Sequence, residues 1–199
     1  MNVDAISYYI NVYGYIIIFI FLFFGIVGIP APEESLLFFL GVLILHNQLS
    51  FILTVLFSVL GAFIGMLTAY ACGTYLGKPF ISKFGKYIGI TEQRLENVKS
   101  RYADNVNRSI ILGFFLPGIR QINPYFAGIT KIPFLKFVVL SLIGAIIWTV
   151  PFIAGGYYLG KVFNINPKYV PYLGVLFLLI FLISVLMNYI KKNSTRIRQ

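Results

Sequence analysis

Two short segments of this chain place ionisable side chains beside helix-breaking residues within long apolar runs. The first, Pro30-Ala31-Pro32-Glu33-Glu34, puts two carboxylates at the head of an apolar stretch. A charged side chain at bilayer depth costs about 2.5–3.5 kcal/mol on insertion scales, so these glutamates serve a function or lie in water. Ordinary helix initiation, with proline at the first position and acids in the first turn, explains the same pattern. We expect Glu34, more than Glu33, to take part in substrate binding, and Glu34 to exchange protons.

The second segment, Leu116 to Pro124, embeds a guanidinium between apolar runs. Arg120 follows residues that interrupt a helix and so leave backbone amides available as donors. Gln121 and Asn123 add polar groups nearby. Because a guanidinium holds phosphate oxygens with two parallel hydrogen bonds, we predict that Arg120, aided by Gln121 and Asn123, binds a phosphate group. A snorkelling arginine that only reports membrane topology is the alternative. The predicted helix breaks of both segments are Pro30, Pro32, Pro117, Gly118 and Pro124.

No enzyme-like constellation accompanies these residues. The chain has one histidine, His46, one cysteine, Cys72, and no second acidic cluster. Nucleophilic catalysis needs a nucleophile with a base beside it, and a metal site needs several ligands at suitable spacing. We therefore expect that the protein is not an enzyme and uses neither a metal nor a cofactor.

The composition is that of a membrane protein. Of the 199 residues, 59% are hydrophobic and only 11% are charged, whereas about a quarter of the residues in soluble domains are charged. The mean hydropathy is +0.87. The net charge of +10 would suggest nucleic acid in a soluble protein, but the basic residues border apolar runs, so we expect no nucleic-acid partner. Positive-inside reasoning places the basic clusters, within 78–108 and 191–198, on the cytoplasmic side.

The apolar runs predict one membrane domain, 1–199, built from two repeats. Repeat one covers about 13–77 and repeat two about 109–160, with an amphipathic linker helix of about 78–108 between them and a C-terminal transmembrane helix of about 168–190. The predicted spanning helices within the repeats are 13–28, 50–76 and 137–158, and the broken apolar segments are 29–45 and 110–129. Glycines at four-residue spacing, in 61–65, 73–77 and 156–160, predict close helix packing.

The two broken segments occupy matching positions in the repeats. With both basic clusters inside, the first segment enters the membrane from the outer side and the second from the inner side, so their orientations are opposed. Short, Pro/Gly-interrupted hydrophobic segments in two such halves indicate a transporter site at an inverted-repeat interface. The expected fold is thus an all-α integral membrane protein, an inverted repeat of re-entrant helical hairpins plus transmembrane helices, with a cytoplasmic amphipathic linker helix. Two ordinary kinked spans are the alternative.

At these residues the chain resembles the DedA family, also called the VTT or SNARE-associated Golgi protein superfamily of membrane lipid transporters. Pro30 to Glu34 is similar to the family's Pro-x-Pro-Gly-Glu element, and Phe115 to Arg120 matches its Phe-x-Pro-Gly-x-Arg element. Ala127-Gly128, Phe137 and the segment Gly144 to Trp148 continue the similarity. The resemblance implies two re-entrant hairpins that face each other and lipid flipping driven or tuned by protons. It also implies that Glu34 is the membrane-embedded acid and Arg120 the essential arginine.

Three positions depart from the family pattern. Many members have a further acid where this chain has Gly25 or Ile26, an aspartate where it has Met66, and a first arginine where it has Phe114. The pair Gly65-Met66, in place of Gly-Asp, resembles the branch of the family in Gram-positive bacteria. That branch is associated with recycling undecaprenyl phosphate, the carrier lipid of wall synthesis. Another branch is associated with phosphatidylethanolamine.

The expected function is transport of an anionic lipid by its phosphate headgroup across the bacterial cytoplasmic membrane. Undecaprenyl phosphate recycling for cell-wall synthesis is favoured. The alternative substrate is phosphatidylethanolamine or another phospholipid, which the protein would transport or scramble. A further alternative is a small soluble anion. A structural membrane-assembly protein is the alternative of another class. Proton coupling and a homo-oligomeric state stay open.

Overall fold

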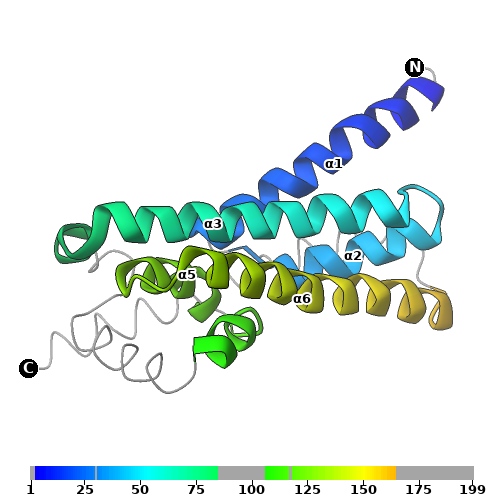
Figure 1. Ribbon diagram of the computed structural model, residues 1–199. Coiled ribbons are helices and arrows are strands. Elements are labelled where there is room, and N and C mark those ends of the chain that lie inside the picture. Colours follow the sequence, from blue (N-terminus) through cyan, green and yellow to red (C-terminus); the bar gives the residue numbers. More distant parts are fainter. Residues whose placement is uncertain (1–2, 30, 85–105, 117, 165–199) are drawn as a thin grey trace, which may run out of the picture. The chain divides into compact units, whose positions relative to one another are not determined.

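The computed structural model describes residues 3–29, 31–84, 106–116 and 118–164, and within them it contains helices and turns but no strand. The expected all-α class is confirmed for this part of the chain. The helices are α1 (Val3–Val27), α2 (Glu33–Leu45), α3 (Phe51–Phe84), α5 (Ile119–Ile129) and α6 (Phe134–Val162), and residues 106–113 are helical as well (Figure 1).

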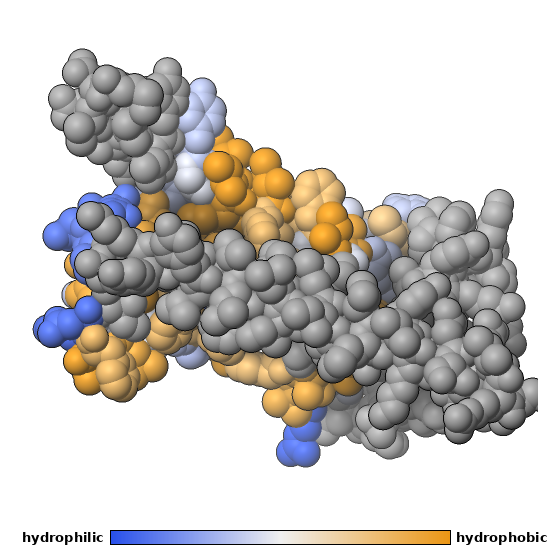
Figure 2. Space-filling model, turned by 180° about the vertical axis from the view of Figure 1, so that it is seen from behind, coloured by the Kyte–Doolittle hydropathy of each residue, from blue (hydrophilic) through white to orange (hydrophobic). Residues whose placement is uncertain are grey.

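Two of these helices are long and apolar enough to cross a membrane, by length and composition. The spans are Phe51–Tyr75 in α3 and Phe134–Val162 in α6, and a shorter apolar helix covers Tyr13–Val27. Figure 2 shows that the described surface on the face in view is mostly apolar. Exposed apolar side chains recur along α6 at helical spacing, including Leu135, Val139 and Leu142. A helix surface of this kind is suited to lipid.

Two helices extend further than the sequence predicted. α1 begins at Val3, before the apolar run, and α3 continues beyond Leu76 to Phe84. Helical hydrogen bonds join backbone groups, so the end of an apolar run does not fix where a helix ends. Intrinsic propensity does not explain the extensions, because neither 3–12 nor 77–84 is rich in strong helix formers. The predicted linker helix after Thr91 and the C-terminal helix of 168–190 lie outside the described residues.

The chain divides into two compact units. The first comprises Met1–Pro30 with Phe51–Pro151, and the second comprises Ala31–Ser50 with Phe152–Gln199. α1, α3, α5 and the first part of α6 therefore belong to the first unit, while α2 and the end of α6 belong to the second.

In the first unit, glycines let α3 approach α1 at backbone distance. A Cβ atom on Gly61 would lie 2.6 Å from the carbonyl oxygen of Phe19, and one on Gly65 would lie 2.9 Å from that of Phe23. Figure 1 shows the crossing near the C-terminal half of α1, whose N-terminal turns lean away from α3. Helices in lipid have no hydrophobic driving force for association, so they depend on van der Waals packing. Small residues at a crossing permit that packing because they let the backbones approach closely.

The contact between α3 and α5 depends on two further glycines. A Cβ on Gly73 would collide with the backbone carbonyl of Tyr125, and one on Gly128 would collide with that of Tyr70. The hydroxyl of Tyr70 donates to the carbonyl of Ile132 just after α5, at 2.6 Å. This reciprocal packing fixes α5 on a helix of spanning length.

In the second unit, α2 packs on the end of α6 through another set of glycines. A Cβ on Gly41 would collide with the backbone of Ile153, and one on Gly156 would collide with that of Phe38. Gly160 faces Val42, whose Cγ2 atom would lie 3.2 Å from an added Cβ. The close packing predicted from glycine spacing is confirmed for Gly61, Gly65, Gly73, Gly156 and Gly160. Gly41 and Gly128, which the spacing did not single out, pack as closely.

Candidate functional site

The candidate arginine stands in the first turn of a short helix. Gly118 caps the N-terminus of α5 with φ +81°, a left-handed conformation that glycine adopts readily. The amides of Ile119 and Arg120 both donate to the carbonyl of Leu116, at 3.1 and 3.0 Å. Pro117 lies outside the described residues. The break before α5 therefore forms at Gly118, and it places Arg120 as the second residue of the helix.

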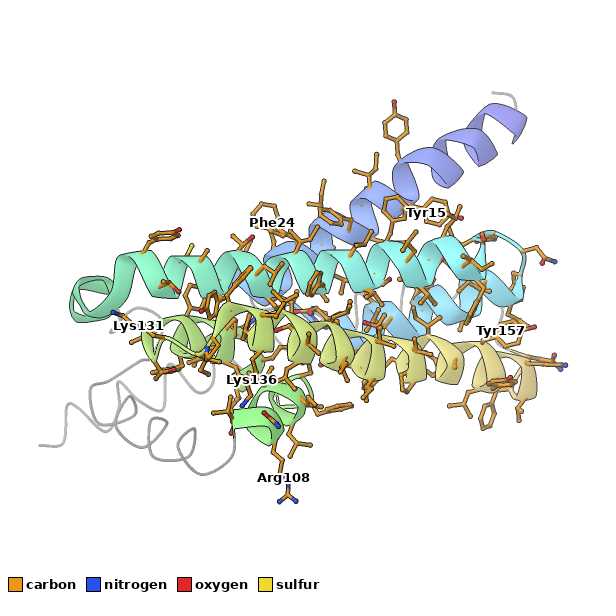
Figure 3. All side chains as sticks on the ribbon, viewed as in Figure 1. Tyr15, Phe24, Arg108, Lys131, Lys136 and Tyr157 are labelled. Carbon is orange, nitrogen blue, oxygen red and sulfur yellow. The ribbon has the colours of Figure 1, made fainter. Side chains whose placement is uncertain are left out.

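The guanidinium of Arg120 is buried against an aromatic ring. The side chain is 4% exposed, and its Cζ atom lies 4.5 Å from the centroid of the Trp148 ring on α6. Nη1 donates to the carbonyl of Phe114 at 3.4 Å. The other described arginine, Arg108, behaves differently, because its side chain is exposed and extends away from the ribbon (Figure 3). The structure thus separates one buried guanidinium from the surface cations.

Trp148 is itself held in place by Phe114. The two rings have centroids 6.1 Å apart at an interplanar angle of 40°, and both side chains are fully buried. A Cβ on Gly144, one turn before Trp148, would lie 2.6 Å from the Phe114 ring, so Gly144 leaves room for that ring. Phe114 stands where many family members have an arginine, and here this position supports an aromatic cluster beside Arg120.

Two other side chains of α5 donate hydrogen bonds to backbone carbonyls at the C-terminal end of α1. The Gln121 amide donates to the carbonyls of Gly25 and Ile29, at 3.1 and 3.4 Å. The Tyr125 hydroxyl donates to the carbonyl of Val27 at 2.6 Å. The last carbonyls of a helix have no partner within it, so these bonds satisfy acceptors that would otherwise lie in apolar surroundings. The predicted contact of Gln121 with substrate stays a prediction.

Asn123 makes similar bonds to the preceding helical segment. Its Nδ2 atom donates to the carbonyls of Ser109 and Ile110, at 2.9 and 3.3 Å. The side chain is buried, and it lies so close to Gly113 that any side chain there would collide with it. The amide therefore fastens the two sides of the break together, and its predicted role in substrate binding is untested.

Pro124 differs from the prediction that it interrupts the helix, because it lies inside α5. Proline removes one backbone hydrogen bond and crowds the preceding turn, at a cost of about 3 kcal/mol in an ordinary helix interior. Here the ring is buried, and the neighbouring residues Phe126 and Ala127 are buried too. We attribute the tolerance of Pro124 to this packing.

The two candidate acids begin α2 in the second unit. Pro32 stands at the N-cap position with φ −78°, as expected for a break before the helix, while Pro30 lies outside the described residues. Glu33 is fully buried and Glu34 is half-buried, so burial singles out the acid that the sequence ranked second. The predicted roles of Glu34 in substrate binding and proton exchange stay predictions.

Metal ligands do not gather in the described ranges, where no three His, Cys, Asp or Glu side chains could hold an ion together. His46 follows α2, and its Nδ1 atom lies 2.9 Å from the carbonyl of Val42. This contact gives the histidine a role at the end of a helix.

Sequence reasoning did not single out Trp148 or Tyr125 for the site. The partners of both residues are distant in sequence, so spacing along the chain does not indicate these contacts. The available signal for Trp148 was its place in the segment Gly144 to Trp148, which carries part of the resemblance.

Several known proteins are similar to this chain. A model described as the VTT domain matches residues 29–158, a range that contains both broken segments. "Uncharacterized membrane protein YbfM" of Bacillus subtilis (strain 168) is 39% identical over 148 residues, which cover 74% of this chain and 91% of that protein. "Undecaprenyl phosphate transporter A" of the same organism is 33% identical over 133 residues, covering 65% of this chain and 66% of that protein.

A third relative is "Protein DedA" of Escherichia coli (strain K12). It is 29% identical over 157 residues, which cover 76% of this chain and 71% of that protein. The solved structures include no significant match.

Proposed function

We propose that this chain, which belongs to the VTT domain family of membrane proteins, also called the DedA family, transports a lipid by its phosphate headgroup. Undecaprenyl phosphate is the substrate we favour, since relatives from Bacillus subtilis and Staphylococcus aureus are named undecaprenyl phosphate transporter A. Phosphatidylethanolamine and other phospholipids share the phosphate group and are the alternative substrates.

The observation that carries the proposal is the buried guanidinium of Arg120, 4% exposed, at the start of a short helix. A phosphate headgroup that crosses hydrocarbon without a partner pays the desolvation penalty of an ion, which makes unassisted flipping slow. A guanidinium offers a planar set of donors that matches phosphate oxygens, and the positive end of a helix dipole adds to its field. Arg120 at the N-terminus of α5 combines the two.

We further propose that α2 and α5 are the membrane-inserted arms of two re-entrant hairpins in an inverted repeat. Their 13 and 11 residues correspond to about 20 and 17 Å of helix, short of the roughly 30 Å of a hydrocarbon core. Each helix also follows a break, at Pro32 or at Gly118. In this arrangement the polyprenyl or acyl tail stays in lipid while the headgroup moves between the helix ends.

The setting we propose is the bacterial cytoplasmic membrane, which the chain crosses several times with its basic linker and C-terminus on the cytoplasmic side. We propose that Glu34 takes up a proton when the phosphate binds. Buried Glu33 is the neighbouring acid to compare. Transport of this kind breaks no covalent bond, so the proposal includes no enzymatic step.

The test is lipid transport by purified protein in liposomes. Arg120→Ala should lower the rate by about tenfold to a hundredfold, the equivalent of a charged hydrogen bond of about 1.5–3 kcal/mol. Arg108→Ala, which removes an exposed arginine, is the matched control and should leave the rate unchanged. Undecaprenyl phosphate and phosphatidylethanolamine are offered separately, so that the arms identify the lipid.

Two results would contradict the proposal. Folded Arg120→Ala protein with undiminished transport removes the phosphate role, and wild-type protein that moves neither lipid favours a structural role in membrane assembly. Proton coupling has its own arm, in which Glu34→Gln should flatten the pH dependence of the rate. An unchanged rate and pH profile in that variant removes Glu34 from the proton step.

A further inference from the structure

Trp148 is the one tryptophan of the chain, and it lies against the candidate phosphate-binding residue. The separation of 4.5 Å between the Arg120 Cζ atom and the ring centroid is well within the roughly 6 Å over which a cation is attracted to the face of an aromatic ring. Tryptophan is the most effective ring for this attraction, which strengthens when both groups are removed from water. Trp148 is fully buried, and Arg120 nearly so.

We propose that Trp148 is a positioning residue for phosphate binding: its ring holds the Arg120 guanidinium in the orientation that receives the headgroup. The inference rests on the proposed function and deepens it. The ring lowers the free energy of the buried cation in its apolar surroundings. The phosphate then meets a guanidinium already in place, which reduces the entropy lost on binding.

Two properties of the contact suit a positioning role. Attraction to a π system involves no acceptor atom, so it does not replace the hydrogen bonds that a planar guanidinium with five N–H donors forms with an anion. The bond from Nη1 to the Phe114 carbonyl, at 3.4 Å, adds a second point of attachment that limits rotation of the group. Ring and carbonyl together define where the guanidinium lies.

The ring is also prevented from turning away. Phe114 packs against Trp148 with centroids 6.1 Å apart, and Gly144 admits the Phe114 ring to this place. Many family members have an arginine at the position of Phe114. In this chain, Phe114 packs against the indole of Trp148. The indole in turn lies against Arg120, the single buried arginine of the described residues.

The experiment measures binding of undecaprenyl phosphate to the purified full-length chain. Trp148→Leu should raise the Kd about tenfold and Trp148→Phe, which keeps a weaker ring, about threefold. Phe137→Leu is the matched control, since Phe137 is an equally buried aromatic residue of α6. Its ring stacks on Tyr70, with centroids 4.5 Å apart, so its loss should leave the Kd unchanged.

Fluorescence gives a second readout, the response of Trp148 emission to added lipid, which packing of the ring alone does not produce. Because Trp148 is the only tryptophan, its emission reports the contact directly. Emission should differ between wild type and Arg120→Ala before lipid is added, and undecaprenyl phosphate should shift the emission of wild type but not of Arg120→Ala.

Failure of this inference and failure of the proposed function give different results. If Arg120→Ala loses binding while Trp148→Leu binds as tightly as Phe137→Leu, the positioning role is overturned and the function stands. If Arg120→Ala binds undecaprenyl phosphate as wild type does, the proposed function fails first. Identical emission of wild type and Arg120→Ala overturns the contact itself.

Discussion

Gly155 and Gly156 are adjacent residues of α6 in sharply different surroundings. A Cβ on Gly156 would collide with the carbonyl oxygen of Phe38 on α2 and would lie 2.7 Å from its carbonyl carbon. A Cβ on Gly155 would meet nothing within 4 Å. The substitutions Gly156→Ala and Gly155→Ala therefore introduce the same methyl group into a backbone contact and into open space.

The comparison isolates the packing of α2 on α6. Ordinary contact begins at 3.4 Å and the Phe38 carbonyl carbon would lie at 2.7 Å. Relieving that contact alone requires α2 to move by about 0.7 Å, and the carbonyl oxygen, which would lie closer still, requires a larger movement. Both variants gain about 1 kcal/mol of helix propensity from alanine, and this gain cancels between them. Overpacking costs about 1–3 kcal/mol, so Gly156→Ala should be less stable than Gly155→Ala by that amount.

The assay is unfolding of the purified protein in mixed micelles with increasing SDS, followed by far-ultraviolet circular dichroism. The free energy of unfolding should fall in the order Gly155→Ala, wild type, Gly156→Ala. Equal stability of the two variants, or a less stable Gly155→Ala, would refute the close contact between α2 and α6.

Two further substitutions test the first unit. Gly128→Ala would collide with the Tyr70 carbonyl and place a Cβ 2.7 Å from the Thr74 amide nitrogen, so it should destabilise the protein by up to about 2 kcal/mol after the gain in helix propensity. SDS unfolding measures this change, and a stabilised variant would contradict it. Tyr125→Phe removes the 2.6 Å bond to Val27 and should destabilise the protein by about 0.6–1.5 kcal/mol. Tyr158→Phe on exposed Tyr158 is its control in the same assay, and equal effects of the two would refute the bond.

Much of the helical organisation could be predicted because hydropathy and helix breakers act locally. The apolar runs indicated α3 and α6, and Pro32 and Gly118 marked the starts of α2 and α5. Pro124 shows the limit of this reasoning, because burial of its ring within α5 is a tertiary effect. The early start of α1 and the late end of α3 have the same origin, since hydropathy does not fix where backbone hydrogen bonding stops.

The polar residues near Arg120 show what the sequence could not reveal. Gln121 and Asn123 were predicted to contact substrate because they are close to Arg120 along the chain. In the structure, the side-chain amide of Gln121 donates to a backbone carbonyl of α1, and that of Asn123 donates to a backbone carbonyl of the helical segment 106–113. Trp148, in contrast, is 28 positions away in sequence yet its ring lies beside the guanidinium. Neighbours in a helical bundle follow from packing, which residue spacing along one chain does not encode directly.

The end of α1 has a consequence for how the protein is made. The bonds from Gln121 to Gly25 and from Tyr125 to Val27 join residues 96 and 98 positions apart. The ribosome therefore delivers the first helix well before the residues that complete it, and an unsatisfied carbonyl in hydrocarbon costs several kcal/mol. A nascent chain that has not yet received α5 leaves these carbonyls to water or lipid headgroups. The end of the first helix therefore acquires these two hydrogen-bond donors only after α5 has been synthesised.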